Sequence, residues 1–236
     1  MKNALEWIIH QFKITFIVSD RYKLFIEGFK NTLIIASGAA VIGIIIGSCV
    51  AMVRVYRAQT GKLKILDFVF GLYLAVFRGT PIVVQLLIMY YIILKNFNNA
   101  LIVAVISFGI NSGAYVAEIV RAGIMSVDIG QTEAGRSLGI PAFGTLILIV
   151  LPQAIKNILP ALGNEFIVLL KETSVASFIT VRDLARAGAN VRSATMEPYF
   201  SLLFVALVYF ILVFGVTKLL KIFEKRFSKS DRSNSN

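Results

Sequence analysis

Long apolar runs, separated by short polar segments, extend along most of the chain. Each run is about twenty residues or longer, which is the length that an α-helix needs to cross the hydrocarbon core of a bilayer. The pattern therefore predicts an all-α polytopic membrane protein with five transmembrane helices. The predicted spans are Thr32–Val53, Phe68–Leu94, Ala100–Ala122, Ile155–Ile179 and Pro198–Thr217.

The composition agrees with this pattern and excludes an ordinary soluble domain. Hydrophobic residues make up 57% of the 236 positions, whereas soluble domains contain roughly 45–50%. The net charge of +11 arises largely from residues after the first and last spans, which the positive-inside rule places in the cytoplasm. We therefore expect the N-terminus outside and the C-terminus in the cytoplasm, and no nucleic-acid partner. The basic residues are Arg54, Arg57, Lys62, Lys64, Lys218, Lys221, Lys225, Arg226, Lys229 and Arg232.

The segments before and within the first span carry weaker signals. Residues 1–27 form an N-terminal amphipathic segment in which apolar residues such as Leu5 and Ile8 recur at helical spacing. This segment either lies along the outer membrane surface or packs on the first span. Gly43 and Gly47 have the GxxxG spacing that lets two helices approach closely. We expect them to pack within the chain rather than at a subunit interface.

The second span is interrupted by the sequence Arg78-Gly79-Thr80-Pro81, where proline breaks the helical hydrogen bonding. Either an interfacial helix precedes a span at Pro81–Leu94, or one span is broken at mid-depth and exposes its backbone to a ligand. An arginine at the bilayer centre costs roughly 2.5–3.5 kcal/mol. Arg78 therefore needs a carboxylate partner, water or an interfacial position, and we expect the interface.

Polar residues recur along one face of the third span. Ser107, Asn111, Tyr115 and Glu118 are separated by four, four and three positions, which places them on one side of a helix. A polar stripe in a membrane must face protein or water. The stripe either forms hydrogen bonds between helices or lines a substrate path. Glu118 can also form a local ion pair with Arg121.

The fourth span carries three ionisable residues, Glu165, Lys171 and Glu172. Such groups must face the interior of the bundle, where they form a salt-bridge network or bind a solute. The following charged segment, Val181–Glu197, is expected to be an outer loop or helix that is either simply solvated or a contact for an extracellular partner. His10 is the only histidine, and we predict no metal site.

A short polar helix is predicted between the third and fourth spans. Asp128 with Gln131 is a capping pair for its start, and Gly139 is a stop signal at its end. Gly135 in its middle costs roughly 1 kcal/mol relative to alanine. Small residues are useful where another surface approaches the backbone, so the helix Ile129–Leu138 is predicted to dock on a partner.

This segment resembles the cytoplasmic EAA loop of ABC importer permeases. The matching pattern is Glu133-Ala134-Gly135-x3-Gly139-x9-Ile149-x-Leu151-Pro152, with glycine at position 135 where the family usually has alanine. Other segments are similar to the polar amino-acid branch of that family, and the resemblance covers roughly residues 28–222. These segments are Phe77-Arg78-Gly79-Thr80-Pro81 with Gln85, Gly163-Asn164-Glu165-Phe166 and Leu170-Lys171-Glu172-Thr173-Ser174.

The resemblance implies the transmembrane subunit of a type I ABC importer in the bacterial cell membrane. It implies a permease domain at 28–222 with a coupling helix at about 128–139. The basic cytoplasmic tail at 223–236 is expected from its composition to be disordered. The implied partners are two ABC ATPase subunits, an extracellular or periplasmic amino-acid-binding protein, and a second permease copy or a sister permease. The implied substrates are polar amino acids such as arginine, glutamine, histidine or cystine.

Two groups of site residues follow from these matches and from polarity and position. The predicted ATPase-coupling residues are Gln131, Glu133, Ala134, Gly135, Arg136 and Gly139. The substrate-path candidates are Arg78, Thr80, Gln85, Asn111, Tyr115, Glu118, Glu165, Lys171, Glu172 and Thr173.

The chain itself is not expected to be an enzyme. It contains no Walker A sequence and no Gly-x-Ser-x-Gly elbow, so ATP and Mg²⁺ are expected on the partner ATPase. Two alternatives are a membrane scaffold or sensor that recruits an ATPase, and an ion-driven transporter with Glu118 or Glu165 as a proton site. Five spans without an evident inverted repeat fit the ion-driven transporter poorly.

Overall fold

The computed structural model describes residues 2–233, and side chains from residue 5 to residue 225. No strand occurs among residues 2–233, which are helical apart from short connections. The elements are α1 (Lys2–Phe12), η1 (Lys13–Ile17), η2 (Val18–Asp20), α2 (Tyr22–Thr60), α3 (Lys64–Gly79), α4 (Ile82–Ile88), η3 (Met89–Ile93), α5 (Ala100–Met125), α6 (Ile129–Ser137), α7 (Ala142–Thr145), η4 (Leu146–Val150), α8 (Leu151–Glu172), η5 (Thr173–Ile179), α9 (Leu184–Thr195) and α10 (Pro198–Ser233).

The membrane-spanning elements match the sequence prediction. Within the described residues, four helical segments are long and apolar enough to cross a bilayer: Tyr22–Thr60, Ala100–Met125, Ala142–Ile179 and Pro198–Lys225. A further pair, Lys64–Gly79 and Ile82–Ile93, passes the same test together but is bent by 112°. The prediction of five spans is confirmed when this bent pair counts as one.

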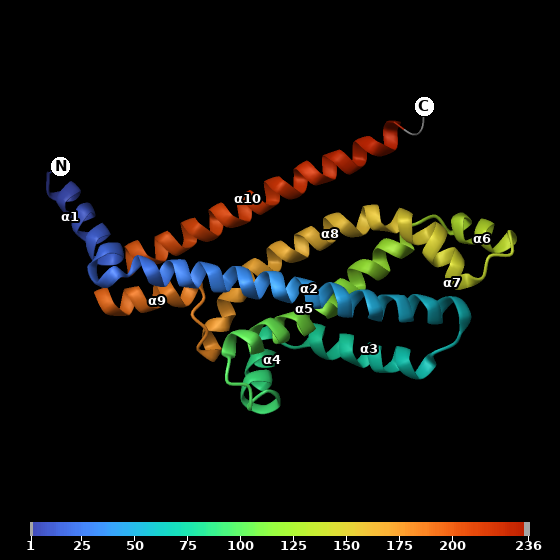
Figure 1. Ribbon diagram of the computed structural model, residues 1–236, viewed down its shortest axis with the longest axis horizontal. Coiled ribbons are helices and arrows are strands. Elements are labelled where there is room, and N and C mark those ends of the chain that lie inside the picture. Colours follow the sequence, from blue (N-terminus) through green and yellow to red (C-terminus); the bar gives the residue numbers. More distant parts are fainter. Residues whose placement is uncertain (1, 234–236) are drawn as a thin grey trace.

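The long helices extend along the length of the molecule, and α10 diverges from α2 towards its C-terminal end (Figure 1). Helices α6 and α7 lie at the end to which the C-terminal part of α10 points, whereas α1 lies at the opposite end. The tail that we expected to be disordered is helical as far as Ser233. Residues 234–236 lie outside the described part of the chain.

Helices α2 and α5 pack closely together, because each offers glycines to the other. A Cβ atom on Gly47 would lie 2.6 Å from the Cβ of Val116, and one on Gly109 would lie 2.7 Å from the Cβ of Ile42. Gly43 likewise faces α5. The expectation that the GxxxG pair packs within the chain is therefore confirmed.

The core surrounds this pair and reaches the bent span and η5. Apolar side chains from α2, α4, α5, α8 and η5 meet in one cluster, which fixes the bent span against the straight helices. Its fully buried members include Ile35, Leu86, Phe108, Leu169 and Ile179.

Aromatic contacts attach the N-terminal segment to the start of α10 and to α2. Trp7 lies 6.0 Å from Phe200 between ring centroids, and Phe16 lies 4.7 Å from Phe204. Phe16 also contacts Phe25 of α2 at 5.5 Å. The segment thus packs on the start of α10 and on the first span, which is one of the two arrangements expected for it.

The charged segment Val181–Glu197 contains helix α9, which begins at a buried cap. The side chain of Asp183 accepts hydrogen bonds from the backbone N–H groups of Ala185 and Arg186, both at 3.0 Å. Asp183 is fully buried, and this burial raises the pKa of its carboxyl group to about 6. Arg182 pairs with Glu27 at 3.6 Å. Much of the charge in this segment therefore holds α9 in place, and a partner would meet exposed residues such as Arg186.

Candidate functional site

The polar helix predicted from the sequence is present as α6, with clear signals at both ends. Asp128 caps its start by accepting a hydrogen bond from the Gly130 N–H at 2.7 Å, and Gly139 follows its end with a positive φ of 80°. The capping pair is half correct, because the Gln131 side chain does not return to the cap. Its Oε1 instead accepts a hydrogen bond from Gln153 Nε2 at 3.1 Å, which ties α6 to the start of α8.

The glycine in the middle of α6 has a different role from the one predicted. Gly135 is buried, and a Cβ atom there would lie 2.7 Å from Thr145 Cγ2 and 2.8 Å from Ile149 Cδ1. The surface that approaches its backbone therefore belongs to α7 and η4 of the same chain. Gly135 therefore does not present surface of its own to a partner, and its small size lets α6 lie directly on the returning chain.

The remaining predicted coupling residues are on the outside of the molecule. They are Gln131, Glu133, Ala134, Arg136 and Gly139. Sequence reasoning missed two apolar side chains beside them, because Ile129 is 70% exposed and Leu138 is 80% exposed. The sequence did contain a signal for these two residues. They flank a short polar helix and have no apolar partners at helical spacing. Such exposed apolar groups are typical of a contact surface.

The break in the second span is closed by two buried amide side chains. The amide nitrogen of Gln85 donates to Phe77 O at 2.9 Å, to Thr80 O at 2.9 Å and to Thr80 Oγ1 at 2.8 Å. Its Oε1 accepts a hydrogen bond from Asn111 Nδ2 at 2.8 Å. The end of a helix leaves carbonyl groups without partners, and these amides supply donors to them. Gln85 and Asn111 are thus engaged in holding the bend, which supports the interhelical alternative for Asn111.

The position of this break favours the mid-span alternative over the interfacial one for Arg78. Asn111, which also donates to Phe77 O at 3.2 Å, lies near the middle of α5 rather than at either end. Arg78 follows Phe77 and has the carboxylate partner that a mid-span arginine requires. Its Nη1 lies 3.8 Å from Glu118 Oε2, and its guanidinium lies 5.9 Å from the ring centroid of Tyr115.

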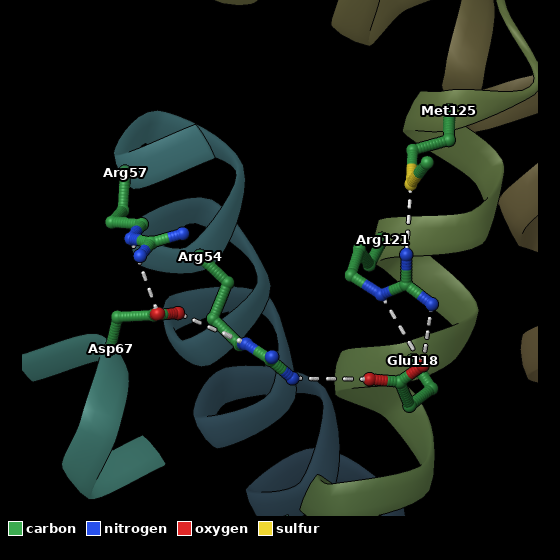
Figure 2. Close-up of polar contacts among 6 residues, drawn as sticks. All are labelled: Arg54, Arg57, Asp67, Glu118, Arg121 and Met125. Atoms are coloured by element: carbon green, nitrogen blue, oxygen red, sulfur yellow. Dashed lines mark hydrogen bonds and ion pairs between the residues drawn. The ribbon is translucent and has the colours of Figure 1, made fainter. Parts of the chain in front are cut away.

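Glu118 is the centre of a group of charges that joins three helices (Figure 2). Its carboxylate lies 2.8 Å from Arg121 Nη2, which confirms the local ion pair, and 3.4 Å from Arg54 Nη1 of α2. Arg54 Nε lies 3.2 Å from Asp67 of α3, and Arg57 Nε lies 3.4 Å from the same carboxylate. We call these five residues, Arg54, Arg57, Asp67, Glu118 and Arg121, the arginine cluster.

The ionisable residues of the fourth span lie around the end of α8 without forming a salt-bridge network. Glu165 accepts a hydrogen bond from Ser112 Oγ at 2.8 Å. Glu165 and Glu172 are half-buried and Lys171 is exposed. None of the ion pairs between described side chains includes any of these three residues. Thr173, the first residue of η5, is buried, and its hydroxyl donates to Leu170 O at the end of α8.

The comparisons with known proteins agree with this geometry. A family profile described as "Binding-protein-dependent transport system inner membrane component" matches residues 39–229. The chain belongs to this family. The resemblance to ABC importer permeases is therefore confirmed, and this permease is a transport subunit rather than an enzyme.

The permease is similar to relatives over most of its length. "Putative glutamine transport system permease protein GlnP" of Rickettsia typhi is 42% identical over 205 residues, 85% of this chain and 91% of the relative. "Arginine transport system permease protein ArtQ" of Bacillus subtilis is 37% identical over 209 residues, 87% of this chain and 93% of the relative.

A solved structure supports the type I importer fold. The structure described as "Crystal structure of an amino acid ABC transporter with histidines" superposes with a TM-score of 0.80 at 41% identity. The match covers 89% of this chain and 98% of that chain.

The permease brings some of the predicted site residues together and separates others. Arg78, Tyr115 and Glu118 form one contact group, and Gln85, Asn111 and Thr80 form another at the break. Ser107 of the polar stripe donates to Val103 O within its own helix. The contacts of the stripe on α5 therefore belong to two different structural features.

Proposed function

We propose that this permease is the transmembrane subunit of an ATP-driven importer of polar amino acids, which an extracellular or periplasmic binding protein delivers. The names of its relatives, which refer to glutamine and arginine transport, support this substrate class. So does the amino acid ABC transporter that shares its fold at 41% identity.

The observation that carries the proposal is the exposed surface of α6 together with its firm attachment. Ile129 and Leu138 present apolar surface. Gln131 bonds to Gln153, and Gly135 lies against Thr145. A partner bound to the exposed surface would therefore move α6 and the start of α8 together.

The proposed cycle uses two ATPase subunits, which bind ATP and Mg²⁺, and two permeases, either two copies or this chain with a sister. Closure of the ATPase subunits moves each α6, and the spans then reorient to open outward. The binding protein releases its amino acid between the permeases, and ATP hydrolysis returns the spans to the inward-open arrangement.

We propose a bacterial inner or plasma membrane location, with the N-terminus outside and the C-terminus in the cytoplasm. Three features support this orientation. The C-terminal part of α10 points to the same end of the molecule as α6, and α1 lies at the other end (Figure 1). Arg54 and Arg57 lie towards the end of α2 that faces α6, as the positive-inside rule requires of cytoplasmic ends.

The coupling proposal is tested with the permease co-purified with candidate ATPase subunits and reconstituted in liposomes. Loaded binding protein is expected to stimulate ATP hydrolysis in the wild type. A variant with Glu133→Lys and Gly139→Asp is expected to lose about tenfold or more of this stimulation, because it changes the charge and the end of α6. Ser137→Ala, also on exposed α6, serves as the matched control and should retain it.

A wild-type permease that neither recruits an ATPase nor responds to any amino acid would overturn the coupling proposal. An ion-driven transporter would then be favoured if uptake followed a proton gradient and was lost in a Glu118 or Glu165 variant. A membrane scaffold would be favoured if the ATPase bound without any transport.

Within the proposed function, Glu172 is our first candidate for the substrate ammonium group, and Lys171 is the candidate for its carboxylate. Neither has an ion-pair partner among the described side chains, whereas Arg78 already has Glu118 and Gln85 already holds the break. A solute brought out of water needs partners for both of its charges. Thr173 and Glu165 adjoin this position and remain secondary candidates.

A Glu172→Gln variant is expected to lower amino-acid uptake about tenfold or more, mainly through weaker apparent affinity, because a charge-assisted hydrogen bond is lost. Concentration-dependent uptake into liposomes measures this change. Glu224→Gln, on α10, is the matched control for loss of a glutamate charge. Unchanged uptake at all concentrations in the Glu172 variant would remove this residue from the substrate site.

A further inference from the structure

A cavity of about 750 Å³ opens beside α6, between the ends of α2 and α5 and the start of α3. All five residues of the arginine cluster line it, and Figure 2 shows how these side chains approach one another from three helices. Ile129 and Thr132 of α6 complete the wall. We call this cavity the arginine pocket.

The charged wall of the arginine pocket has more donors than acceptors. Three guanidinium groups, each with five N–H donors, face only two carboxylates. Arg121 Nη1 donates to the thioether sulfur of Met125 at 2.8 Å, which is a weak acceptor for a cationic donor. The side chain of Arg57 is 45% exposed and has Asp67 as its ion-pair partner. An oxyanion entering the pocket would therefore find guanidinium N–H groups that the two carboxylates do not engage, such as Nη1 of Arg121.

The rest of the wall is mostly apolar, with Ile124, Val127 and Val150 among its residues, and Gln59 and Thr132 are its polar members. A small hydrated anion gains nothing from such an apolar surface. An amphiphile with an anionic head can bind the guanidinium groups with its head and the apolar wall with its hydrocarbon part. The pocket also lies at the basic end of the first span, where Lys62 and Lys64 follow. Basic pockets between helices on the cytoplasmic side suit the phosphate groups of anionic lipids.

We propose that the arginine pocket binds the phosphate headgroup of an anionic phospholipid from the cytoplasmic leaflet. The phosphate oxygens accept hydrogen bonds from Arg57 and Arg121, and the glycerol and upper acyl chain lie against the apolar wall. Because α6 forms part of this wall, the bound lipid contacts α2, α5 and α6 at once. The binding itself does not depend on transport, whereas its place in the cytoplasmic leaflet rests on the proposed orientation and any effect of the lipid on coupling rests on the proposed function.

The proposal is tested by native mass spectrometry of the full-length permease in detergent, titrated with phosphatidylglycerol or phosphatidylcholine of the same acyl chains. Phosphatidylglycerol is expected to bind about fivefold more tightly or better, and Arg57→Gln is expected to lose about that factor. Lys62→Gln removes an exposed basic residue of the adjoining segment that does not line the pocket, and should bind like the wild type. Arg57→Lys retains the charge and should retain most of the preference.

Three results would overturn the proposal. Equal loss of binding in the Arg57→Gln and Lys62→Gln variants would show a general attraction to surface charge. Displacement of phosphatidylglycerol by millimolar inorganic phosphate would identify free phosphate as the ligand. The absence of any lipid preference, combined with protection of Arg57 from phenylglyoxal by an added ATPase subunit, would assign the pocket to an acidic segment of that protein.

The lipid titration measures neither transport nor ATP hydrolysis. Failure of the proposed function therefore leaves its result intact, and failure of lipid binding leaves the coupling proposal intact.

Discussion

A Glu118→Gln variant is expected to unfold about 1–3 kcal/mol more easily than the wild type, because its carboxylate is shared by three guanidinium groups. Arg54, Arg78 and Arg121 lie 3.4, 3.8 and 2.8 Å from its oxygens. Removing one partner from a buried charge group costs roughly 3–5 kcal/mol. We reduce that value because the Glu118 side chain is 21% exposed and the arginines 31–44%, so water screens them in part.

The measurement is equilibrium unfolding of the purified permease in mixed micelles, without partners. Glu133→Gln is the matched control, since Glu133 is exposed on α6 and takes part in none of the ion pairs between described side chains. A double-mutant cycle with Arg78→Gln isolates the pair across the break. A coupling energy near zero would show that Arg78 is neutralised by something other than Glu118.

A Gln85→Leu variant is expected to have the second large effect, a loss of about 2–4 kcal/mol of stability. Leucine cannot donate to Thr80 O or Phe77 O, and Asn111 loses its acceptor at 2.8 Å, so that only the longer Asn111–Phe77 O bond at 3.2 Å remains at the break. Each buried polar group without a partner costs roughly 1–3 kcal/mol. The bend between α3 and α4 should then be poorly defined, with less folded protein in the membrane and an earlier unfolding transition.

A second variant separates the effect of losing the amide donor from the effect of changing the side-chain shape. Gln85→Glu preserves the shape of the side chain but cannot donate when ionised, so it should also destabilise the permease. Gln153→Leu removes an exposed amide from the start of α8 and should leave the unfolding transition near the wild-type value. If Gln85→Leu unfolds like the wild type, the bend is held by packing of Leu86 and its neighbours instead of by the amides.

Features that depend on local sequence were predictable. The five spans follow from the lengths of the apolar runs. The limits of α6 follow from the side chain of Asp128, which caps its start, and from the positive φ angle of Gly139 after its end. The pairing of Glu118 with Arg121 also follows from spacing along one helix. In each case the deciding interaction joins residues that are close in the sequence.

Features that depend on packing between distant segments were not predictable. Arg54 and Glu118 are 64 positions apart, and nothing in their neighbourhoods indicates that α2 and α5 bring them together. Gln85 and Asn111 were marked as polar candidates, but their mutual hydrogen bond depends on a 112° bend whose geometry the sequence leaves open. Gly135 has the size that docking requires, and only the fold reveals that the docked surface is Thr145 of the same chain.

The glycine contacts between α2 and α5 also bear on how motion in this molecule can be measured. Ile42 of α2 fills the space above Gly109, and Val116 of α5 fills the space above Gly47, so sliding or rotation of one helix would force these side chains into backbone. The two helices therefore constitute a fixed frame. The distance between spectroscopic labels on α2 and α5 is expected to stay constant. It provides an internal reference for measuring displacements of α6, α8 and α10.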